Sequence, residues 1–439
     1  MKTHQPLSGR AGCGLAYLIP KNTTEHGGAM AKSKKNASVV KPAPELKVKG
    51  FRAAGISAGI KKTGKKDLAL ILSDYPVTTA ALFTTNKVKA APVVYDMRRA
   101  RGGHCTSRGV VVNSGNANAC TGAEGYRNAS AMVEAVEKAA SSGRSSLLVS
   151  STGVIGVPLP VEKVLAHAGA LVAALSPDGL HDAAEAIMTT DAFPKKAVVR
   201  GRVGGKLITI AGITKGAGMI CPDMATMLGY FLTDAAVAAP VLKAALKEAA
   251  DSSFNSIIVD NDTSTNDTVM IFASGASGAG LINSRSSDEY RAFVRLLTRL
   301  SVELAHMIVR DGEGATRFIE VQVTGAATNG DARRAARTIA ESFLVKTAFF
   351  GGDPNWGRII AAAGRAGIKF NPDKADIIFN GVAVVTGGLD TGAEKEAAVA
   401  IKQREVVVKV DLHGGRGSSR VWTTDLSYEY VKINSAYRT

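Results

Sequence analysis

A threonine near the middle of the chain, Thr226, has the surroundings of a candidate nucleophile. It follows the segment Lys215–Ala225, in which two glycines and a proline disfavour regular structure. It also opens the apolar run Thr226–Thr233, which has the composition of a buried strand. A threonine that starts a buried strand and is reached through a loop has the position that an N-terminal-nucleophile enzyme needs. Taken alone, however, the run is better explained by a β-branched residue that merely opens a strand.

Several longer segments place this threonine in a wider pattern. In chain order they are Asn113–Gly122, Ser151–Gly156, Lys215–Leu228, Asp353–Arg358 and Tyr430–Thr439. Together they resemble the ornithine acetyltransferase (glutamate N-acetyltransferase) family, and the resemblance extends over nearly all of the chain from Gly50 on. Several long motifs in register are far more specific than one glycine-rich fingerprint. The resemblance implies an N-terminal-nucleophile-like acetyltransferase/aminopeptidase fold of the α/β class, with mixed sheets layered with helices.

The resemblance also implies that the chain cuts itself between Ala225 and Thr226. The threonine hydroxyl attacks the preceding carbonyl, and an N→O acyl shift followed by hydrolysis releases a new N-terminus. A threonine hydroxyl is a weak nucleophile that needs a nearby base. A free α-amine, with a pKa of about 7.7–8.0, supplies that base on the same residue. Cleavage would leave an α chain, 45–225, with the N-terminal α/β domain, and a β chain, 226–439, with the C-terminal α/β domain.

The implied reaction is a two-step acetyl transfer of arginine biosynthesis. N-acetyl-L-ornithine donates its acetyl group to Thr226, ornithine leaves, and L-glutamate then takes the acetyl group. Acetyl-CoA is expected as a second donor, although the sequence has no independent coenzyme A motif, and no other cofactor is expected. The family also implies a heterotetramer of two α and two β chains.

The oxyanion of each acyl step needs hydrogen-bond donors. Thr152 and Gly153 resemble the oxyanion pair of the family, with a side-chain hydroxyl and a backbone N–H. They follow the apolar run Leu147–Val149, so we expect them at the end of a strand. Outside the family pattern, an ordinary turn would be the better explanation.

The resemblance assigns further residues to the amino-acid substrate. Lys215 would supply a cation for a carboxylate. Thr189 would supply a hydroxyl, and Glu313 would pair with the ammonium group of ornithine. Asn434 and Thr439 match substrate-binding positions at the end of the chain. Each has a simpler structural explanation by itself, namely a solvated charge, a helix end, a turn or a terminal tail.

The elements that must position these residues alternate between strands and helices, which favours an α/β or α+β protein. Strands are expected at Leu68–Leu72, Val110–Val112, Leu147–Val149, Leu207–Ile210, Ile257–Asp260, Val269–Ala273, Phe318–Val323, Ile377–Phe379 and Val406–Val410. Helices are expected at Ala129–Ala139, Leu180–Met188 and Ala238–Ala250. Ser286 and Glu289 give a capping-box signature for a long helix that runs towards Val309 and ends by Gly312.

Part of the positive charge of the chain is concentrated in its first 44 residues. The formal net charge is +16, and residues 1–44 carry seven lysines and arginines against one glutamate. We expect this segment to be a disordered leader, and Met30 would itself serve as a protein start. Its few acidic residues would also fit a mitochondrial presequence, and hence the matrix, but lysine outnumbers arginine. A cytoplasmic protein is therefore expected.

The remaining composition excludes several classes. No apolar stretch is long enough to span a membrane. Four cysteines without a CxxC pair indicate a reduced, intracellular protein, and the histidines form no metal motif. The acidic run Asp260–Asp267 lacks the glycine and the closing glutamate of a calcium loop, so we expect a hydrogen-bonded turn near the active site.

Two other functions stay open at this point. An N-terminal-nucleophile aminopeptidase of related fold would share the self-cleavage and the oxyanion turn, and differs in hydrolysing peptides. A nucleic-acid-binding protein would explain the charge, but it would need clustered cations with aromatic platforms. Aromatic residues make up only 5% of the chain, and no long run of lysine and arginine occurs.

Overall fold

The computed structural model describes residues 45–221 and 227–436 and confirms the mixed α/β fold. The strands are β1 (Phe51–Ile56), β2 (Leu68–Phe83), β3 (His104–Asn116), β4 (Leu147–Val154), β5 (Lys195–Val203), β6 (Lys206–Lys215), β7 (Leu228–Thr233), β8 (Ile257–Ile258), β9 (Thr268–Ala273), β10 (Phe318–Ala326), β11 (Asp376–Phe379), β12 (Val382–Thr386), β13 (Leu389–Asp390), β14 (Glu405–Asp411) and β15 (Gly417–Thr424). The helices are α1 (Ala91–Arg99), α2 (Gly122–Ala139), α3 (Val161–Ala173), α4 (Leu180–Ala186), α5 (Ala239–Asp251), α6 (Asp288–Arg310), α7 (Asn329–Ala340), α8 (Phe343–Gly351), α9 (Trp356–Gly364), α10 (Glu394–Ala400) and α11 (Tyr428–Ala436).

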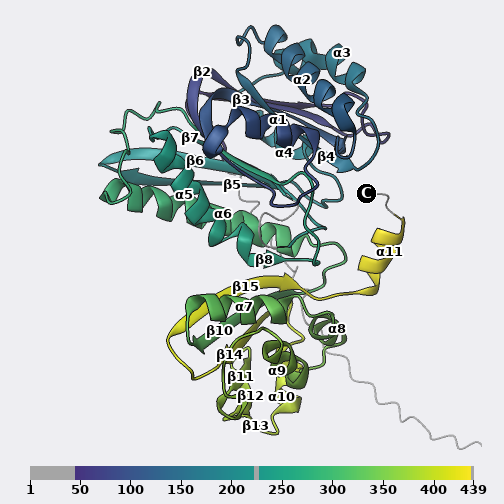
Figure 1. The fold of residues 1–439 in the computed structure, drawn as a ribbon, viewed down its shortest axis with the longest axis vertical. Helices are drawn as coiled ribbons and strands as arrows, with labels where there is room; N and C mark the ends of the chain where they lie inside the picture. The colour runs from purple at the N-terminus through teal and green to yellow at the C-terminus, as the bar shows by residue number, and fades with distance from the viewer. Residues whose placement is uncertain (1–44, 222–226, 437–439) are drawn as a thin grey trace, which may run out of the picture. The chain divides into compact units, whose positions relative to one another are not determined.

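The strands form two mixed sheets, which Figure 1 shows one above the other. The first has the order β4-β3-β2-β9-β7-β6-β5, and β1 also pairs with β2. The pairs β3–β4 and β7–β9 are parallel, and the other neighbours are antiparallel. The second sheet has the order β13-β12-β11-β14-β10-β15-β8.

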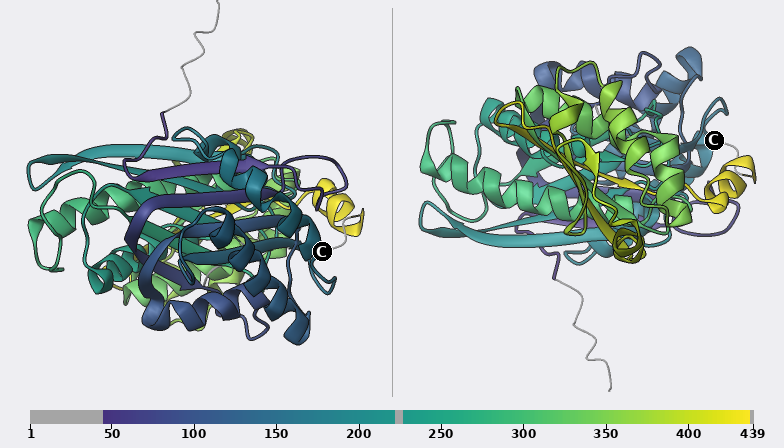
Figure 2. Two further views of the ribbon diagram at one scale, coloured as in Figure 1. Left: turned by 90° about the horizontal axis from the view of Figure 1, so that it is seen from above. Right: turned by 90° about the horizontal axis from the view of Figure 1, so that it is seen from below.

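The first sheet is folded on itself, because the long strand β2 belongs to both of its halves. The start of β2 pairs with β1 and β3, and its end pairs with β9. Alternate residues of the two halves, such as Ile71 and Val110 on one side and Ile213 and Tyr230 on the other, share an inner core. Helices α1, α2 and α3 cover one outer face, and α5 and α6 cover the other, so that four layers result (Figures 1 and 2).

The second sheet carries α7, α8, α9 and α10 on one face, where they share a hydrophobic core with β10, β11 and β14. Phe318 and Trp422, from β10 and β15, instead join the core beneath α6. The edge strand β8 follows α5, and the chain then returns to the first sheet at β9. The connection between β8 and β9 therefore passes where the two sheets meet, and it contains the acidic run 260–267.

The predicted strands and helices are all present, but several of their limits were wrong. The predicted strand Leu68–Leu72 continues to Phe83, because a break in register between Leu72 and Val77 accommodates Pro76 without ending the pairing. The predicted strand Leu147–Val149 continues to Val154, so Thr152 and Gly153 lie within its last residues.

Three other limits also differ. The helix predicted from Ala129 begins at Gly122. The strand predicted over Ile257–Asp260 has only two paired residues, because β15 offers it two partners. The long helix starts one residue later than predicted. Ser287, not Ser286, is its N-cap and accepts a hydrogen bond from the N–H of Tyr290, while the hydroxyl of Ser286 lies 2.8 Å from that of Ser284.

The first sheet combines strands from both sides of residues 222–226. The later strands β7 and β9 lie between β2 and β6, which both come earlier in the chain. The described residues from 45 on thus form one compact unit with a continuous first sheet. Within this described part, no helix has the length and apolarity to cross a bilayer.

Candidate active site

A cavity of about 180 Å³ lies at the ends of β4 and β6, beside the β8–β9 connection. Six of the residues predicted from the sequence line it: Thr152, Gly153, Thr189, Lys215, Glu313 and Asn434. They come from β4, the loop after α4, the end of β6, the turn after α6, and α11. The predicted nucleophile Thr226, its neighbour Ala225 and the terminal Thr439 lie outside the described residues, as does the leader 1–44.

Lys215 and Thr152 meet in the wall of this cavity. The ammonium of Lys215 donates to Oγ1 of Thr152 at 3.2 Å, and both side chains are buried. Since the hydroxyl oxygen accepts this bond, its own hydrogen stays available for a ligand. Burial lowers the pKa of Lys215, and the carboxylate of Asp191 opposes this shift.

Gly153 occupies a position that only glycine suits. Its φ is +133°, and a Cβ would lie 2.3 Å from the carbonyl carbon of Gly115. The pairing of β3 with β4 is irregular there, because Asn116 is opposite both Thr152 and Val154. This local bulge turns the end of β4 towards the cavity.

Buried amides hold the bulge in place, and they explain the motif that starts at Asn113. The side chain of Asn113 donates to the carbonyl of Asn116 at 2.9 Å and accepts from the hydroxyl of Ser151 at 2.6 Å. Asn266, on the opposite segment, donates to the carbonyls of Ser151 and Ala117 at 2.8 and 2.7 Å. Sequence reasoning missed Asn266 as a site residue, although it belongs to the acidic run that was expected to form a turn near the site.

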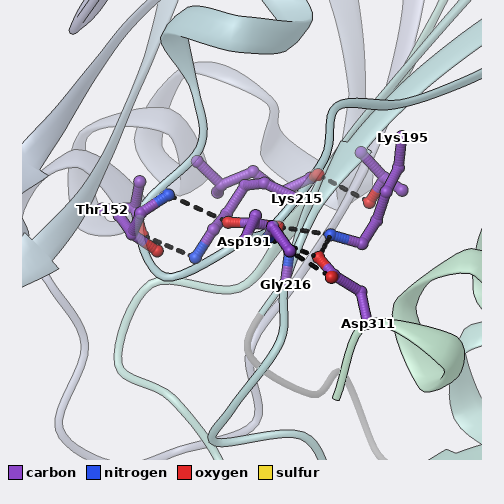
Figure 3. A network of polar contacts seen from close by, with 10 residues as sticks. Thr152, Asp191, Lys195, Lys215, Gly216 and Asp311 are labelled. Carbon is purple, nitrogen blue, oxygen red and sulfur yellow. Dashed lines mark hydrogen bonds and ion pairs between the residues drawn. The ribbon is translucent and has the colours of Figure 1, made fainter. Parts of the chain in front are cut away.

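A buried ionic cluster behind the cavity was also missed (Figure 3). Lys195 bridges Asp191 at 2.6 Å and Asp311 at 2.5 Å, and these three side chains are almost fully buried. The carboxylate of Asp191 accepts from the N–H groups of Thr189 and Gly216, at 2.9 and 2.7 Å.

This cluster positions three of the predicted substrate-binding residues. Thr189 and Glu313 lie two residues from Asp191 and Asp311, and Lys215 precedes Gly216, whose N–H donates to Asp191. Burial opposes ionisation of Asp191, but Lys195 and Lys215 outweigh it and lower its pKa to about 2. Burial raises the pKa of Asp311 despite the same lysine. A charge spacing of four residues from Asp191 to Lys195 was the only signal of the cluster in the sequence.

Glu313 and Asn434 join the turn after α6 to the last helix. The side-chain amide of Asn434 donates to Oε2 of Glu313 at 2.9 Å. Gly218 lies against the same carboxylate, because a Cβ there would be 2.4 Å from Glu313. Tyr430, one turn before Asn434, donates to Oδ2 of Asp260 at 3.2 Å. One end of the cavity thus has carboxylates that suit an ammonium group, and the other has the Lys215 cation.

The described residues on both sides of 222–226 are anchored to the β8–β9 connection. Asp260 accepts from the N–H groups of Met219 and Ile220 at 2.7 and 2.8 Å. Asp267 accepts from the N–H of Met227 at 3.0 Å. Burial raises the pKa of Asp267 well above its usual range. The acidic run therefore acts as a hydrogen-bonded turn at the site, as the sequence predicted.

The motif Asp353–Arg358 lies elsewhere. It begins α9, where Asn355 is the N-cap, and it lines a different cavity, together with Asp390 and Glu394. No residue of the motif lines the cavity at Lys215. Across 45–221 and 227–436, no three histidine, cysteine or acidic side chains are grouped so as to hold a metal ion.

Known proteins resemble this chain over most of its length. The model of the ArgJ family matches residues 52–439. The arginine biosynthesis bifunctional protein ArgJ of Geobacter sulfurreducens is 52% identical over 396 residues, which cover 90% of this chain and 100% of that protein. The protein of the same name from Symbiobacterium thermophilum is 50% identical, covering 89% of this chain and 97% of that protein. A crystal structure of the ArgJ protein of Bacillus halodurans is 41% identical, with a TM-score of 0.45, and covers 46% of this chain and 96% of that chain.

Proposed function

This chain belongs to the ArgJ family of arginine-biosynthesis enzymes, and we propose that it transfers acetyl from N-acetyl-L-ornithine to L-glutamate through Thr226. The observation that carries the proposal is the meeting of Thr152, Gly153, Lys215 and Glu313 in one small cavity. This cavity, at about 180 Å³, is below the usual range of roughly 300–1,000 Å³ for ligand pockets. That size suits an acetylated amino acid better than a peptide.

The first step is self-cleavage between Ala225 and Thr226. The hydroxyl oxygen of Thr226 attacks the carbonyl of Ala225, the C–N bond breaks, and the α-amine of Thr226 takes a proton as it leaves. Water then hydrolyses the ester, which releases the carboxylate of Ala225 and restores the hydroxyl. The anchoring of Met219 and Ile220 by Asp260, and of Met227 by Asp267, supports this step, because it fixes described residues on both sides of the proposed cleavage point.

Turnover uses the same oxygen. The free α-amine of Thr226 takes the hydroxyl proton, and the oxygen attacks the acetyl carbonyl of N-acetylornithine. The hydroxyl of Thr152 and the N–H of Gly153 stabilise the oxyanion, a kind of contact worth about 10²–10³ in rate. The C–N bond breaks, the α-nitrogen of ornithine takes the proton, and an acetyl ester remains on Thr226. The α-amine of glutamate then attacks this ester, the bond between the acetyl carbon and the oxygen of Thr226 breaks, and that oxygen takes back a proton from the attacking nitrogen, which releases N-acetylglutamate.

The two ends of the cavity suit the two substrates. Lys215 pairs with the substrate carboxylate, and Thr189 contributes a hydroxyl. Glu313, held by Asn434, pairs with the side-chain ammonium of ornithine. Thr439 is proposed to bind substrate in the same site. Two α and two β chains are proposed to form the working assembly in the cytoplasm, and acetyl-CoA is proposed as a second donor.

Two measurements on purified protein test this function. A denaturing gel with N-terminal sequencing should show two chains, each about half of the 45.5 kDa total, the second starting Thr-Met-Leu-Gly. Thr226→Ala should stay one chain and be inactive, while Thr226→Ser should keep some cleavage because it retains a hydroxyl. Labelled acetyl should move from N-acetylornithine to glutamate. An active uncut chain would refute the mechanism, and peptide hydrolysis without acetyl transfer would instead indicate an aminopeptidase.

A further inference from the structure

The charges in the lining of the active-site cavity are not balanced. Among the described residues that line it, Lys215 is the only cation. Three others are acidic: Asp260, Asp262 and Glu313. Burial, and then the charges of these three carboxylates, raise the pKa of the Tyr430 hydroxyl, so all three lie near that hydroxyl. This end of the cavity therefore favours a ligand group that is cationic.

The carboxylate of Asp260 is already engaged within the protein. Its Oδ1 accepts from the N–H groups of Ile220 and Asp262 at 2.8 and 3.4 Å. Its Oδ2 accepts from the N–H of Met219 at 2.7 Å and from the hydroxyl of Tyr430 at 3.2 Å. Two bonds to each oxygen use the four lone-pair positions of a carboxylate. Asp260 thus holds the wall of the cavity together and has little capacity left for a ligand.

The carboxylate of Asp262 differs in this respect. The residue is exposed and lines the cavity. Within 45–221 and 227–436, its carboxylate oxygens have no hydrogen-bond or ion-pair partner, and only its N–H is bonded, to Asp260. Glu313, by comparison, accepts from the amide of Asn434 through Oε2. Asp262 therefore keeps its full capacity to accept hydrogen bonds from a ligand.

We propose that Asp262 is a specificity-determining residue, whose carboxylate binds the side-chain ammonium of the donor beside Glu313 and repels the side-chain carboxylate of the acceptor. This inference rests on the proposed function. Both substrates are L-α-amino acids that react at the α-nitrogen and place the α-carboxylate at Lys215. Their side chains therefore extend towards the same end of the cavity, where ornithine presents a cation and glutamate an anion.

The test compares the two half-reactions on the self-cleaved full-length enzyme. In a two-step transfer, kcat/KM for each substrate reports only the half-reaction of that substrate. Asp262→Asn removes the charge and keeps the size of the side chain. We expect kcat/KM for N-acetylornithine to fall about twofold to fivefold, as for an exposed ion pair, and kcat/KM for glutamate to rise by a similar factor. Both changes should diminish in about 1 M salt, which screens exposed charges.

Two controls separate the effect of charge from an effect on structure. N-acetyl-L-norvaline has the carbon chain of N-acetylornithine without the terminal amine, so its kcat/KM as donor should be the same in wild type and Asp262→Asn. Asp373→Asn removes an exposed carboxylate that does not line the cavity, and it should change neither half-reaction.

The outcomes distinguish this inference from the function on which it rests. An unchanged kcat/KM for N-acetylornithine in Asp262→Asn at low salt would overturn the role of Asp262. Losses of equal size with N-acetylornithine and N-acetyl-L-norvaline would also overturn it, because they would show a purely structural effect, and so would a fall in kcat/KM for glutamate. Absence of acetyl transfer in the wild type would instead contradict the proposed function.

Discussion

The side-chain amide of Asn434 donates to Oε2 of Glu313 at 2.9 Å and so ties the last helix, α11, to the turn that follows α6. The two residues are 121 positions apart, and Asn434 is exposed although it lines the cavity. A residue near the end of the chain thereby orients the carboxylate proposed to hold ornithine.

Asn434→Ala should separate turnover from self-cleavage. A hydrogen bond to a charged group contributes about 1.5–3 kcal/mol, so we expect KM for N-acetylornithine to rise about tenfold. Two chains should still appear on a denaturing gel, since cleavage holds no free amino acid. Deletion of 434–439 should abolish transfer with cleavage intact. Full transfer after the deletion would show that the tail is only surface, and would remove Asn434 and Thr439 from the site.

Lys195→Met should destabilise the protein strongly. Removal of this ammonium leaves Asp191 and Asp311 buried without their shared cation, and breaking a buried pair costs about 3–5 kcal/mol. The free energy of unfolding in urea measures the loss. The matched control is Lys66→Met, whose partners Asp182 and Glu185 are exposed, and its cost should stay below about 1 kcal/mol. Similar losses of unfolding free energy in both variants would mean that the buried cluster contributes no more stability than the exposed ion pairs of Lys66.

The same cluster predicts a pH dependence. The pKa of Asp191 is lowered to about 2 in the folded protein, against about 3.9 in an unfolded chain. The ionised carboxylate therefore contributes stability that is fully present above pH 4 and is lost as the pH falls towards 2. The difference in the free energy of unfolding between wild type and Asp191→Asn should therefore shrink as the pH falls from about 4 towards 2. A difference that stays constant from pH 5 to pH 2.5 would contradict the lowered pKa.

Asn266→Ala should reduce kcat with little change in KM. The amide bonds two buried carbonyls, those of Ser151 and Ala117, and so holds the end of β4 beside the proposed oxyanion site. Without these two hydrogen bonds the carbonyls are buried and unpaired, which costs about 1–3 kcal/mol for each, and the proposed oxyanion donors at the end of β4 shift. We expect kcat to fall by about tenfold to a hundredfold. Asn371→Ala, at an exposed cap, is the control, and an unchanged kcat in Asn266→Ala would assign that residue a purely structural role.

Self-cleavage should not separate the two chains. β7 and β9 would belong to the β chain, yet they lie between β2 and β6 of the α chain and pair with both. Two cleaved chains that share one sheet and its cores should co-elute under native conditions and separate only in denaturant. Elution of a free α chain without denaturant would contradict this arrangement of strands.

The sequence by itself determined the types of residues in the site and the class of the fold. Thr152, Lys215 and Asn434 stand in motifs whose residues are consecutive, and local spacing is enough to identify such motifs. The strands at Val110–Val112 and Val406–Val410 were also predictable. The first is a short apolar run that is buried throughout, and in the second buried valines alternate with more exposed residues, so each pattern carries a local signal.

Only the tertiary structure decided how these residues meet. Asp191, Lys195 and Asp311 form one cluster through pairing across more than 100 positions, and no local pattern encodes which buried charge finds which partner. The order of strands, with β9 and β7 inserted between β2 and β6, depends in the same way on non-local hydrogen bonds. The length of β4 was misjudged for the same reason: Thr152 and Gly153 are polar or small, and they continue the strand only because β3 offers them partners. Side-chain type is a property of each residue, whereas pairing and burial belong to the folded chain as a whole.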